Sequence, residues 1–407
     1  MSNDASGPFT TYQRRLFVFL SVATFFEGYD FIALTQILPN LRHDMSLDEA
    51  AGGALVMTIN FGTVLAYLLV RKADRWGRKR VLTLTIAGYT LFTFASGFAP
   101  NVWVFALCQL AARVFLIGEW ATSNVIAAEE FPAARRGTVI GVLQAFSSLG
   151  AVTCAGVVPK LLPLYGWRTV YFVGIVPLLV LAFARRNLKE TRRFEERLGG
   201  REERGLFHIL GTPHRKRVFQ LGAIWFFAYI AAQNAVTFWK EFAMNERGFT
   251  DGQVGAAVAI AAVASMPFVF LAGKLIDVIG RRRGAAVIFS VASLGTLACY
   301  TLHGRVLLTL ALVLGIFGAS AIMPVLNAYT TELFPTDLRG DAFAWSNNLV
   351  GRIGYVLSPL AVGLAAREWG WGIAVGSTAI FPLVTLLLIF LLLPETRGRE
   401  LEETAAL

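Results

Sequence analysis

Four charged residues lie inside long apolar stretches of this 407-residue chain, where a charge is costly to place. They are two acids and two arginines: Asp30, Arg113, Glu119 and Arg352. A charge at membrane depth usually faces a water-filled cavity or pairs with another charge. These residues therefore indicate either the binding of an anion together with the movement of a proton, or permanent ion pairs between helices.

The acids are suited to carrying protons. Glu27 precedes Asp30 by three residues, so the two lie on one face of a helix. Burial favours the protonated form of a carboxyl group, which lets the group take up and release a proton near neutral pH. We predict that Asp30, Glu27 or Glu119 couples proton movement to the binding of a substrate. A permanent salt bridge is the alternative interpretation.

The arginines are suited to a carboxylate. A guanidinium is permanently charged and presents a planar fork of donors. Asn348 lies four residues before Arg352 and Tyr355 three residues after it, so a helix would place both beside that arginine. The Tyr355 ring could stack on an aromatic substrate. We predict that Arg113 and Arg352 bind substrate; the alternative is that each pairs internally with one of the acids.

Polar residues in two other apolar segments are further candidates for the lining of a substrate cavity. Tyr229 and Gln233 are four residues apart and share a helical face. Asn234 and Asn327 are amides in apolar surroundings, and a buried amide needs hydrogen-bond partners. A substrate or water would satisfy them, and so would hydrogen bonds between helices.

The segments that must position these residues are long and apolar. The chain is 56% hydrophobic and 16% charged, whereas soluble domains are about 25% charged. Runs of about 20 apolar residues are long enough to cross a bilayer as helices. We predict twelve spans, at about 16–38, 52–72, 80–99, 102–128, 137–162, 168–187, 218–243, 253–276, 284–302, 305–331, 341–366 and 371–393.

The chain contains two copies of one unit. The loop D-R-W-G-R-K-R, which begins at Asp74, recurs as D-V-I-G-R-R-R from Asp277, 203 positions later. The same offset relates Glu129 to Glu332. Repeats of this kind are typical of membrane transporters. We therefore predict an all-α membrane protein with twelve transmembrane helices in two pseudo-symmetric six-helix bundles.

The same pattern predicts the domain boundaries. The charged stretch between the sixth and seventh apolar runs is the single long connection, and we interpret it as a solvated linker. The expected parts are an N-terminal bundle, a cytoplasmic linker, a C-terminal bundle and a cytoplasmic tail: 1–187, 188–217, 218–393 and 394–407.

The distribution of Lys and Arg predicts the orientation. The N-terminus, the even-numbered connections and the tail hold 28 of these residues, and the odd-numbered connections hold 7. This asymmetry predicts that both termini are cytoplasmic. The compact loops favour placement in a cell (inner) membrane. The net charge of +10 is thereby explained without a nucleic-acid partner.

Several classes of activity lack a sequence signal. The cysteines and histidines have no metal-ligand spacing, and we expect neither a metal nor a cofactor. The sequence has no phosphate-binding loop of the Walker type and no Ser/His/Asp constellation, so we expect that the protein is not an enzyme. The expected partners are a small-molecule substrate, protons and the lipid bilayer, and we expect a monomer.

The repeated loop resembles the signature loop of the major facilitator superfamily. The run Pro394-Glu395-Thr396-Arg397-Gly398 is similar to a signature of its sugar-porter and organic-acid branch. Glu27-Gly28-Tyr29-Asp30 resembles an element of aromatic-acid/proton symporters, while Gly118-Glu119-Trp120 is closer to the metabolite/proton symporters. The first loop departs from the family pattern at Val70, where a glycine is usual.

The resemblance implies a secondary transporter that works by alternating access, in which the repeated loops latch the two halves on the cytoplasmic side. It assigns the gating role to these residues: Asp74, Arg75, Gly77, Arg78, Glu129, Arg136, Asp277, Gly280, Arg281, Glu332 and Arg339.

Together these observations favour proton-coupled symport of a small organic anion, with aromatic carboxylates among the candidates. A sugar porter, an exporter of lipophilic compounds and a non-transporting membrane sensor are the alternatives.

Overall fold

The computed structural model describes residues 9–172, 207–335 and 338–397, apart from the side chains of residues 68, 70–75, 128, 133, 134, 136 and 137. In the first half of the chain the helices are α1 (Thr11–Asp44), α2 (Glu49–Trp76), α3 (Arg78–Ser96), α4 (Val102–Glu130), α5 (Ala133–Tyr165) and α6 (Arg168–Phe172). The first five predicted spans each coincide with one of these helices. The rest of the sixth, from residue 173, lies outside the described residues.

In the second half, α9 (Arg215–Thr237) and α10 (Trp239–Asn245) form a pair that is bent by 42°. They are followed by α11 (Asp251–Ile279), α12 (Arg281–Thr301) and α13 (Arg305–Glu332). The last spans are built from α14 (Arg339–Phe343), the π-helix η3 (Ala344–Gly351), α15 (Arg352–Gly376), the 3-10 turn η4 (Ser377–Ala379) and α16 (Ile380–Leu392). A kink at Gly370, whose φ is +78°, interrupts α15 between the eleventh and twelfth predicted spans.

Many of these helices are built for a bilayer. Within the described residues, eight helices are long and apolar enough to cross a membrane, or nine if the bent pair counts as one span. The apolar windows of α11 and α13 bury only 33% and 39% of their residues. Exposed apolar side chains in such numbers are suited to lipid rather than water.

By its internal contacts the chain divides into two compact units. Unit 1 comprises Met1–Leu41 and Thr58–Glu203, and unit 2 comprises Arg42–Met57 and Arg204–Leu407. Residues 42–57, which form the end of α1 and the start of α2, therefore belong to unit 2 rather than to the rest of the first six helices.

Unit 1 is held together by close contact between helix backbones. A Cβ atom on Gly28 would lie 1.9 Å from the carbonyl oxygen of Ser147, and one on Gly150 would lie 1.8 Å from that of Phe25. Only glycine permits such an approach of α1 to α5, as is common for helices in membranes. Beside this contact, Leu20 packs in an apolar cluster with side chains of α3, α4 and α5.

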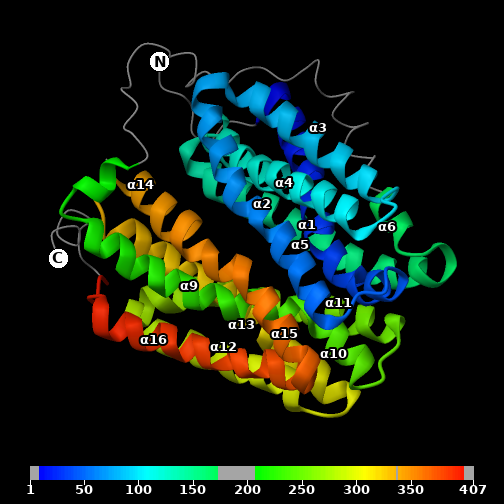
Figure 1. Ribbon diagram of the computed structural model, residues 1–407. Coiled ribbons are helices and arrows are strands. Elements are labelled where there is room, and N and C mark those ends of the chain that lie inside the picture. The colour runs from blue at the N-terminus through cyan, green and yellow to red at the C-terminus, as the bar shows by residue number, and fades with distance from the viewer. Residues whose placement is uncertain (1–8, 173–206, 336–337, 398–407) are drawn as a thin grey trace. The chain divides into compact units, whose positions relative to one another are not determined.

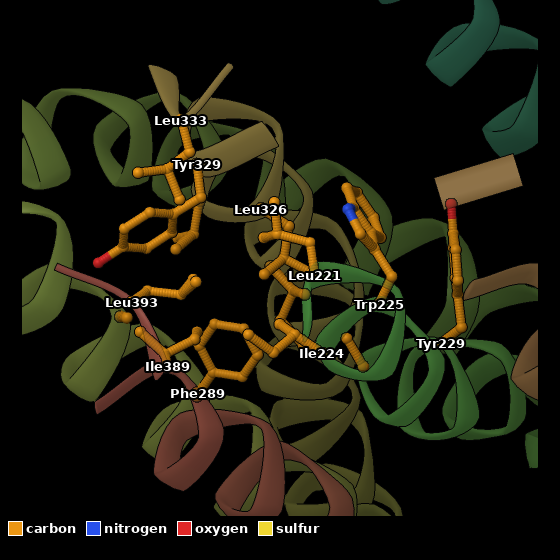
Figure 2. Packing of buried hydrophobic residues seen from close by; sticks show 14 of the residues in the cluster. Leu221, Ile224, Trp225, Tyr229, Phe289, Leu326, Tyr329, Leu333, Ile389 and Leu393 are labelled. Atoms are coloured by element: carbon orange, nitrogen blue, oxygen red, sulfur yellow. The ribbon is translucent and has the colours of Figure 1, made fainter. Parts of the chain in front are cut away.

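Unit 2 has one large apolar cluster. Ile224 of α9, Phe289 of α12 and Ile389 of α16 meet in it, as Figure 2 shows. The rings of Trp225 and Tyr229 leave α9 on the same side in that view. In Figure 1, α12 (yellow) and α16 (red) run alongside each other in this unit. The cluster fixes the face of α9 that carries the polar residues described below.

Candidate functional site

Glu27 and Glu119 of unit 1 are buried and Asp30 is half-buried, and one arginine, Arg113, lies near Glu27 and Asp30. Glu27 on α1 is 8% exposed, and Glu119 and Arg113 on α4 are 0% and 6% exposed. Glu27 lies within electrostatic range of Glu119, Arg113 and Asp30, with the Ser147 hydroxyl of α5 beside it. The structure therefore brings the predicted residues of the first half, which come from α1 and α4, into one polar group among apolar helices.

Arg113 has spare donor capacity within this group. Its guanidinium lies over the Phe31 ring at 5.0 Å, and one terminal nitrogen, Nη1, has no hydrogen-bond partner among the described residues. Within the described parts of unit 1, Arg113 forms no ion pair with Asp30 or Glu119. In the described residues of this conformation, Arg113 therefore does not form the salt bridge to Asp30 or Glu119 that was the alternative prediction.

The acids are likewise only partly satisfied. The Thr93 hydroxyl donates to Asp30 Oδ2 at 3.4 Å, and the Ser123 hydroxyl donates to Glu119 Oε1 at 2.5 Å. The second carboxyl oxygen, Oε2, of both Glu27 and Glu119 has no partner among the described residues. Buried polar atoms are nearly always satisfied in folded proteins, so exceptions mark places where a ligand, a water molecule or a proton binds.

Arg352 of unit 2 is held between two tyrosine rings. Its guanidinium carbon lies 5.1 Å from the ring centre of Tyr229 and 5.1 Å from that of Tyr355. The two rings meet edge to face, with centres 5.5 Å apart. The Arg352 Nε has no hydrogen-bond partner in the described structure. This arrangement presents a cation next to aromatic faces, which suits a planar anion.

The amide beside this pair is Asn347, whereas the sequence pointed to Asn348. The Tyr229 hydroxyl donates to Asn347 Oδ1 at 3.0 Å. The reason is the π-helix η3, which ends at the residue before Arg352. A π-helix closes i→i+5 hydrogen bonds, so the residue five positions before Arg352 takes the place that an α-helix would give to the fourth. Asn348 itself is half-buried and has no hydrogen-bond partner among the described residues.

The other predicted lining residues differ in their surroundings. Asn234 is fully buried, and its amide nitrogen donates to the Ile230 carbonyl one turn earlier at 2.7 Å, while its Oδ1 has no partner in the described structure. Gln233 is half-buried, and Asn327 is exposed. The amide nitrogen of Asn234 thus forms a hydrogen bond within its own helix, and Oδ1 is the atom of this side chain that could bind a ligand.

The first copy of the repeated loop is described in part. Gly77 has a φ of +92°, a left-handed conformation that glycine adopts without strain. Arg78 directly after it is buried and pairs with Glu129 of α4 at 3.4 Å. The side chains of Asp74, Arg75 and Arg136 lie outside the described residues.

The second copy forms a charged network in unit 2. The Arg281 guanidinium contacts Asp277 at 2.5 Å and Glu332 at 2.7 Å. The Thr396 hydroxyl donates to the same Glu332 carboxylate at 2.5 Å. Arg339 instead donates to the Phe334 carbonyl, at 3.4 Å. The network therefore joins α11, α12 and α13 to the residues after α16.

The start of α12 is capped by Glu395, an acid that follows α16. Glu395 accepts from the backbone N–H groups of Arg281 at 2.8 Å and Arg282 at 2.9 Å, and also from those of Thr396 and Arg397. Gly280, with a φ of +97°, allows this approach, because a Cβ there would lie 2.9 Å from Glu395 Oε2. Burial alone would raise the pKa of Glu395, but the four backbone donors outweigh it and hold the pKa below its usual value.

A second charge cluster in unit 2 was not predicted. Arg42 contacts Glu241 of α10 at 2.8 Å and Glu49 of α2 at 2.6 Å, and it lies 5.5 Å from the Trp371 ring centre. The Glu241 side chain is 1% exposed. The hydropathy pattern predicted that Arg42 lies in a connection between two spans, where charged residues are common and do not indicate a buried ion pair. The signal that could have found it is the pair Lys240-Glu241 within an otherwise apolar run.

The start of α2 is tightly packed beside this cluster. A Cβ on Gly53 would lie 2.3 Å from the Pro359 carbonyl oxygen of α15. Lys240, the neighbour of Glu241, pairs with Asp251 at the start of α11. The cluster therefore ties the segment 42–57 to α10 and α15 inside unit 2.

No metal centre emerges from the described parts of the chain. Residues 9–172, 207–335 and 338–397 contain no group of three or more His, Cys, Asp or Glu side chains that could hold a metal ion.

Comparison with known proteins identifies the family and several relatives of this chain. A family model described as Major Facilitator Superfamily matches residues 20–239 and again residues 221–406. A probable 4-methylmuconolactone transporter of Cupriavidus pinatubonensis is 28% identical, with 92% of this chain and 89% of that protein covered. A gallate transporter of Pseudomonas putida is 24% identical, with 90% and 88% covered. A cis,cis-muconate transport protein of Acinetobacter baylyi is 27% identical, with 90% and 91% covered.

Solved structures share the fold. A bacterial homologue of the human lysosomal transporter Spinster, in an inward-facing and occupied conformation, matches with a TM-score of 0.77 and 15% identity, covering 94% of this chain and 97% of that chain. A D-xylose–proton symporter matches with a TM-score of 0.75 and 19% identity, covering 96% and 100%. These matches confirm the predicted fold class of two bundles with twelve membrane helices.

The Glu395 cap predicts a pH-dependent contribution to stability. A carboxyl whose pKa is lowered by folding stabilises the protein above its ordinary pKa, and this contribution disappears as the pH falls through the lowered value. Glu395→Gln should therefore reduce the free energy of unfolding by about 1 kcal/mol at pH 7, the usual cost of a lost N-cap. The difference from the unmodified protein should shrink towards pH 3. Thermal unfolding in detergent micelles measures both.

The control for this prediction is Glu368→Gln, because Glu368 is an exposed acid of the same unit. It should change stability little at either pH. A deficit of Glu395→Gln that is equally large at pH 7 and pH 3 would show that its charge is not what caps α12.

The Arg42 cluster predicts a large and non-additive loss of stability. Arg42→Gln should lower the free energy of unfolding by about 3 kcal/mol or more, since it leaves the buried Glu241 carboxylate without its cation. Adding Glu241→Gln should restore part of the loss. Arg367→Gln is the matched control: the Arg367–Asp48 pair is exposed, at 3.4 Å, and such pairs are worth about 0–1 kcal/mol. Additive effects in the double variant would contradict the buried pair.

Proposed function

We propose that this chain, which belongs to the Major Facilitator Superfamily and is a secondary membrane transporter rather than an enzyme, carries small organic anions, with planar aromatic or unsaturated carboxylates as the preferred class. The observation that carries the proposal is Arg352, a cation between the rings of Tyr229 and Tyr355 with an unpaired Nε. The guanidinium would bind the carboxylate and the rings would contact the planar part of the substrate.

The relatives support this substrate class. Their names refer to 4-methylmuconolactone, gallate and cis,cis-muconate, which are compounds with acid or lactone groups on rings or unsaturated chains. The unpaired nitrogen of Arg113 supports a second anion contact in the first half of the chain. A sugar site would instead be expected to be rich in Gln and Asn side chains that are free to bind hydroxyl groups, whereas the amide nitrogen of Asn234 is bound to a carbonyl of its own helix.

Proton coupling is the second part of the proposal. Glu27, Asp30 and Glu119 are carboxyl groups at membrane depth, and two of them keep a free oxygen. Binding a proton there would remove a buried charge when no substrate is present, and a neutral acid near Arg113 would leave that arginine available to a substrate anion. The role of these acids is therefore to link the proton gradient to anion uptake.

The remaining parts follow the family pattern. The repeated loops, with Arg78–Glu129 in one copy and Arg281–Glu332 in the other, are proposed to act as cytoplasmic gates. We place the protein as a monomer in the inner membrane with both termini in the cytoplasm, and we retain the boundaries 1–187, 188–217, 218–393 and 394–407 for its parts.

The substrate proposal is tested by uptake of radiolabelled gallate and cis,cis-muconate into proteoliposomes. Arg352→Gln should raise KM by about 10–100-fold, since a hydrogen-bonded charge is worth about 1.5–3 kcal/mol. Arg352→Lys should recover part of the loss because it keeps the charge without the fork. Tyr355→Phe is the control, which keeps the ring and should transport nearly normally. An unchanged KM in Arg352→Gln would reject this arginine as the anion contact.

The coupling proposal is tested by comparing driven uptake with exchange. Asp30→Asn or Glu27→Gln should abolish accumulation driven by an inward proton gradient, because the amide binds no proton. Counterflow exchange of the same substrate without a gradient should persist, which shows that the variant still folds and binds. Undiminished gradient-driven accumulation in both variants, and in Glu119→Gln, would remove these acids from the coupling step.

A further inference from the structure

A groove lies between the start of α9 and the end of α16 in unit 2, apart from the residues discussed so far. It has a volume of about 660 Å³. Five residues of α9 and one of α16 line it: Arg215, Lys216, Phe219, Gln220, Ala223 and Leu392. Arg215 is the first residue of α9 and Leu392 the last of α16, so the groove opens where two membrane helices end.

The lining changes from charged to apolar with depth. Arg215, Phe219 and Ala223 follow one another at intervals of four, and a helix places such residues on one face. Each interval is about one turn, or about 5.4 Å. Arg215 and Lys216 are exposed at the mouth, and Phe219 is 50% exposed one turn deeper. An amphiphile with an anionic head and an apolar chain matches this order.

The cations at the mouth have no acidic partner among residues 9–172, 207–335 and 338–397. The groove lining contains no acid, and neither Arg215 nor Lys216 forms an ion pair with any of the described residues. The acid just beyond α16, Glu395, is bound to backbone N–H groups at the start of α12. Within the described part of the chain, two adjacent positive charges are therefore left without a partner.

The groove lies at helix ends, where lipid headgroups are expected to meet a membrane protein. Arg282 donates to the Phe390 carbonyl at the end of α16, so α12 begins, α9 begins and α16 ends at the same end of unit 2. This is the end at which the positive residues of the chain are concentrated by sequence, as expected for the face that meets anionic lipids.

We propose that this groove binds an anionic phospholipid. Its phosphate lies against Arg215 and Lys216, Gln220 donates to the headgroup, and one acyl chain lies against Phe219, Ala223 and Leu392. This occupant is favoured because two cations without an ion-pair partner among the described residues match an anionic head, and the apolar lining matches an acyl chain. A neutral lipid, the transported anion and a second copy of the chain each match this lining less well.

The test is lipid retention by the full-length protein, measured by native mass spectrometry after exchange from nanodiscs of phosphatidylcholine with phosphatidylglycerol. The unmodified protein should retain phosphatidylglycerol preferentially. Arg215→Gln/Lys216→Gln should weaken this preference by about five-fold for each cation removed. Ala223→Phe, which fills the groove and keeps both cations, should also displace the bound lipid. The matched control is Lys274→Gln/Arg283→Gln, two exposed cations at the same end but outside the groove.

Four results would overturn the proposal. One is equal retention of the two lipids by the unmodified protein, and another is equal loss of preference in the control variant. A third is full retention in Ala223→Phe, which would mean that charge attraction alone holds the lipid. The fourth is a dimer that dissociates when phosphatidylglycerol is added, which would identify a second copy as the occupant. None of these results bears on substrate uptake, so the two proposals fail separately.

Discussion

The free-energy cost of a charge in an apolar membrane interior governs this structure. Most helices expose apolar side chains to lipid, so each charged group must be paired, capped or kept for a ligand. The chain uses all three solutions. Arg42 is paired with Glu241, Glu395 caps α12, and Arg113 and Arg352 keep donors unpaired. This division separates residues that hold the fold together from residues that can do work during transport.

The charged residues differ in whether their main partners are carboxylates or aromatic rings. Arg281 shares its guanidinium between Asp277 and Glu332, and such a network is stable while all partners are present. Arg352 has aromatic rings in place of carboxylates, which stabilise a cation without neutralising it. Under the proposed function, a substrate carboxylate would meet a charge whose desolvation has already been partly compensated, which would favour binding.

Much of the fold follows from hydropathy, but the partners of the charged residues do not. The spans were predictable because long apolar runs are continuous in sequence, and the bend after Thr237 did not disturb them. Asn347 was missed because a π-helix changes the helical period just before Arg352. Glu395 was missed as a cap because its partner lies more than 100 residues away. Arg42 was missed because the sequence alone does not distinguish a solvated charge near a helix end from one with a buried partner.

The central claim is that an unpaired guanidinium recognises the carboxylate of the substrate. Calorimetric binding of gallate and of its primary amide to the purified protein tests this most directly, since the two ligands share the ring and differ only in charge. The account predicts that the carboxylate binds at least about tenfold more tightly than the amide. Equal affinity for the two ligands would contradict it.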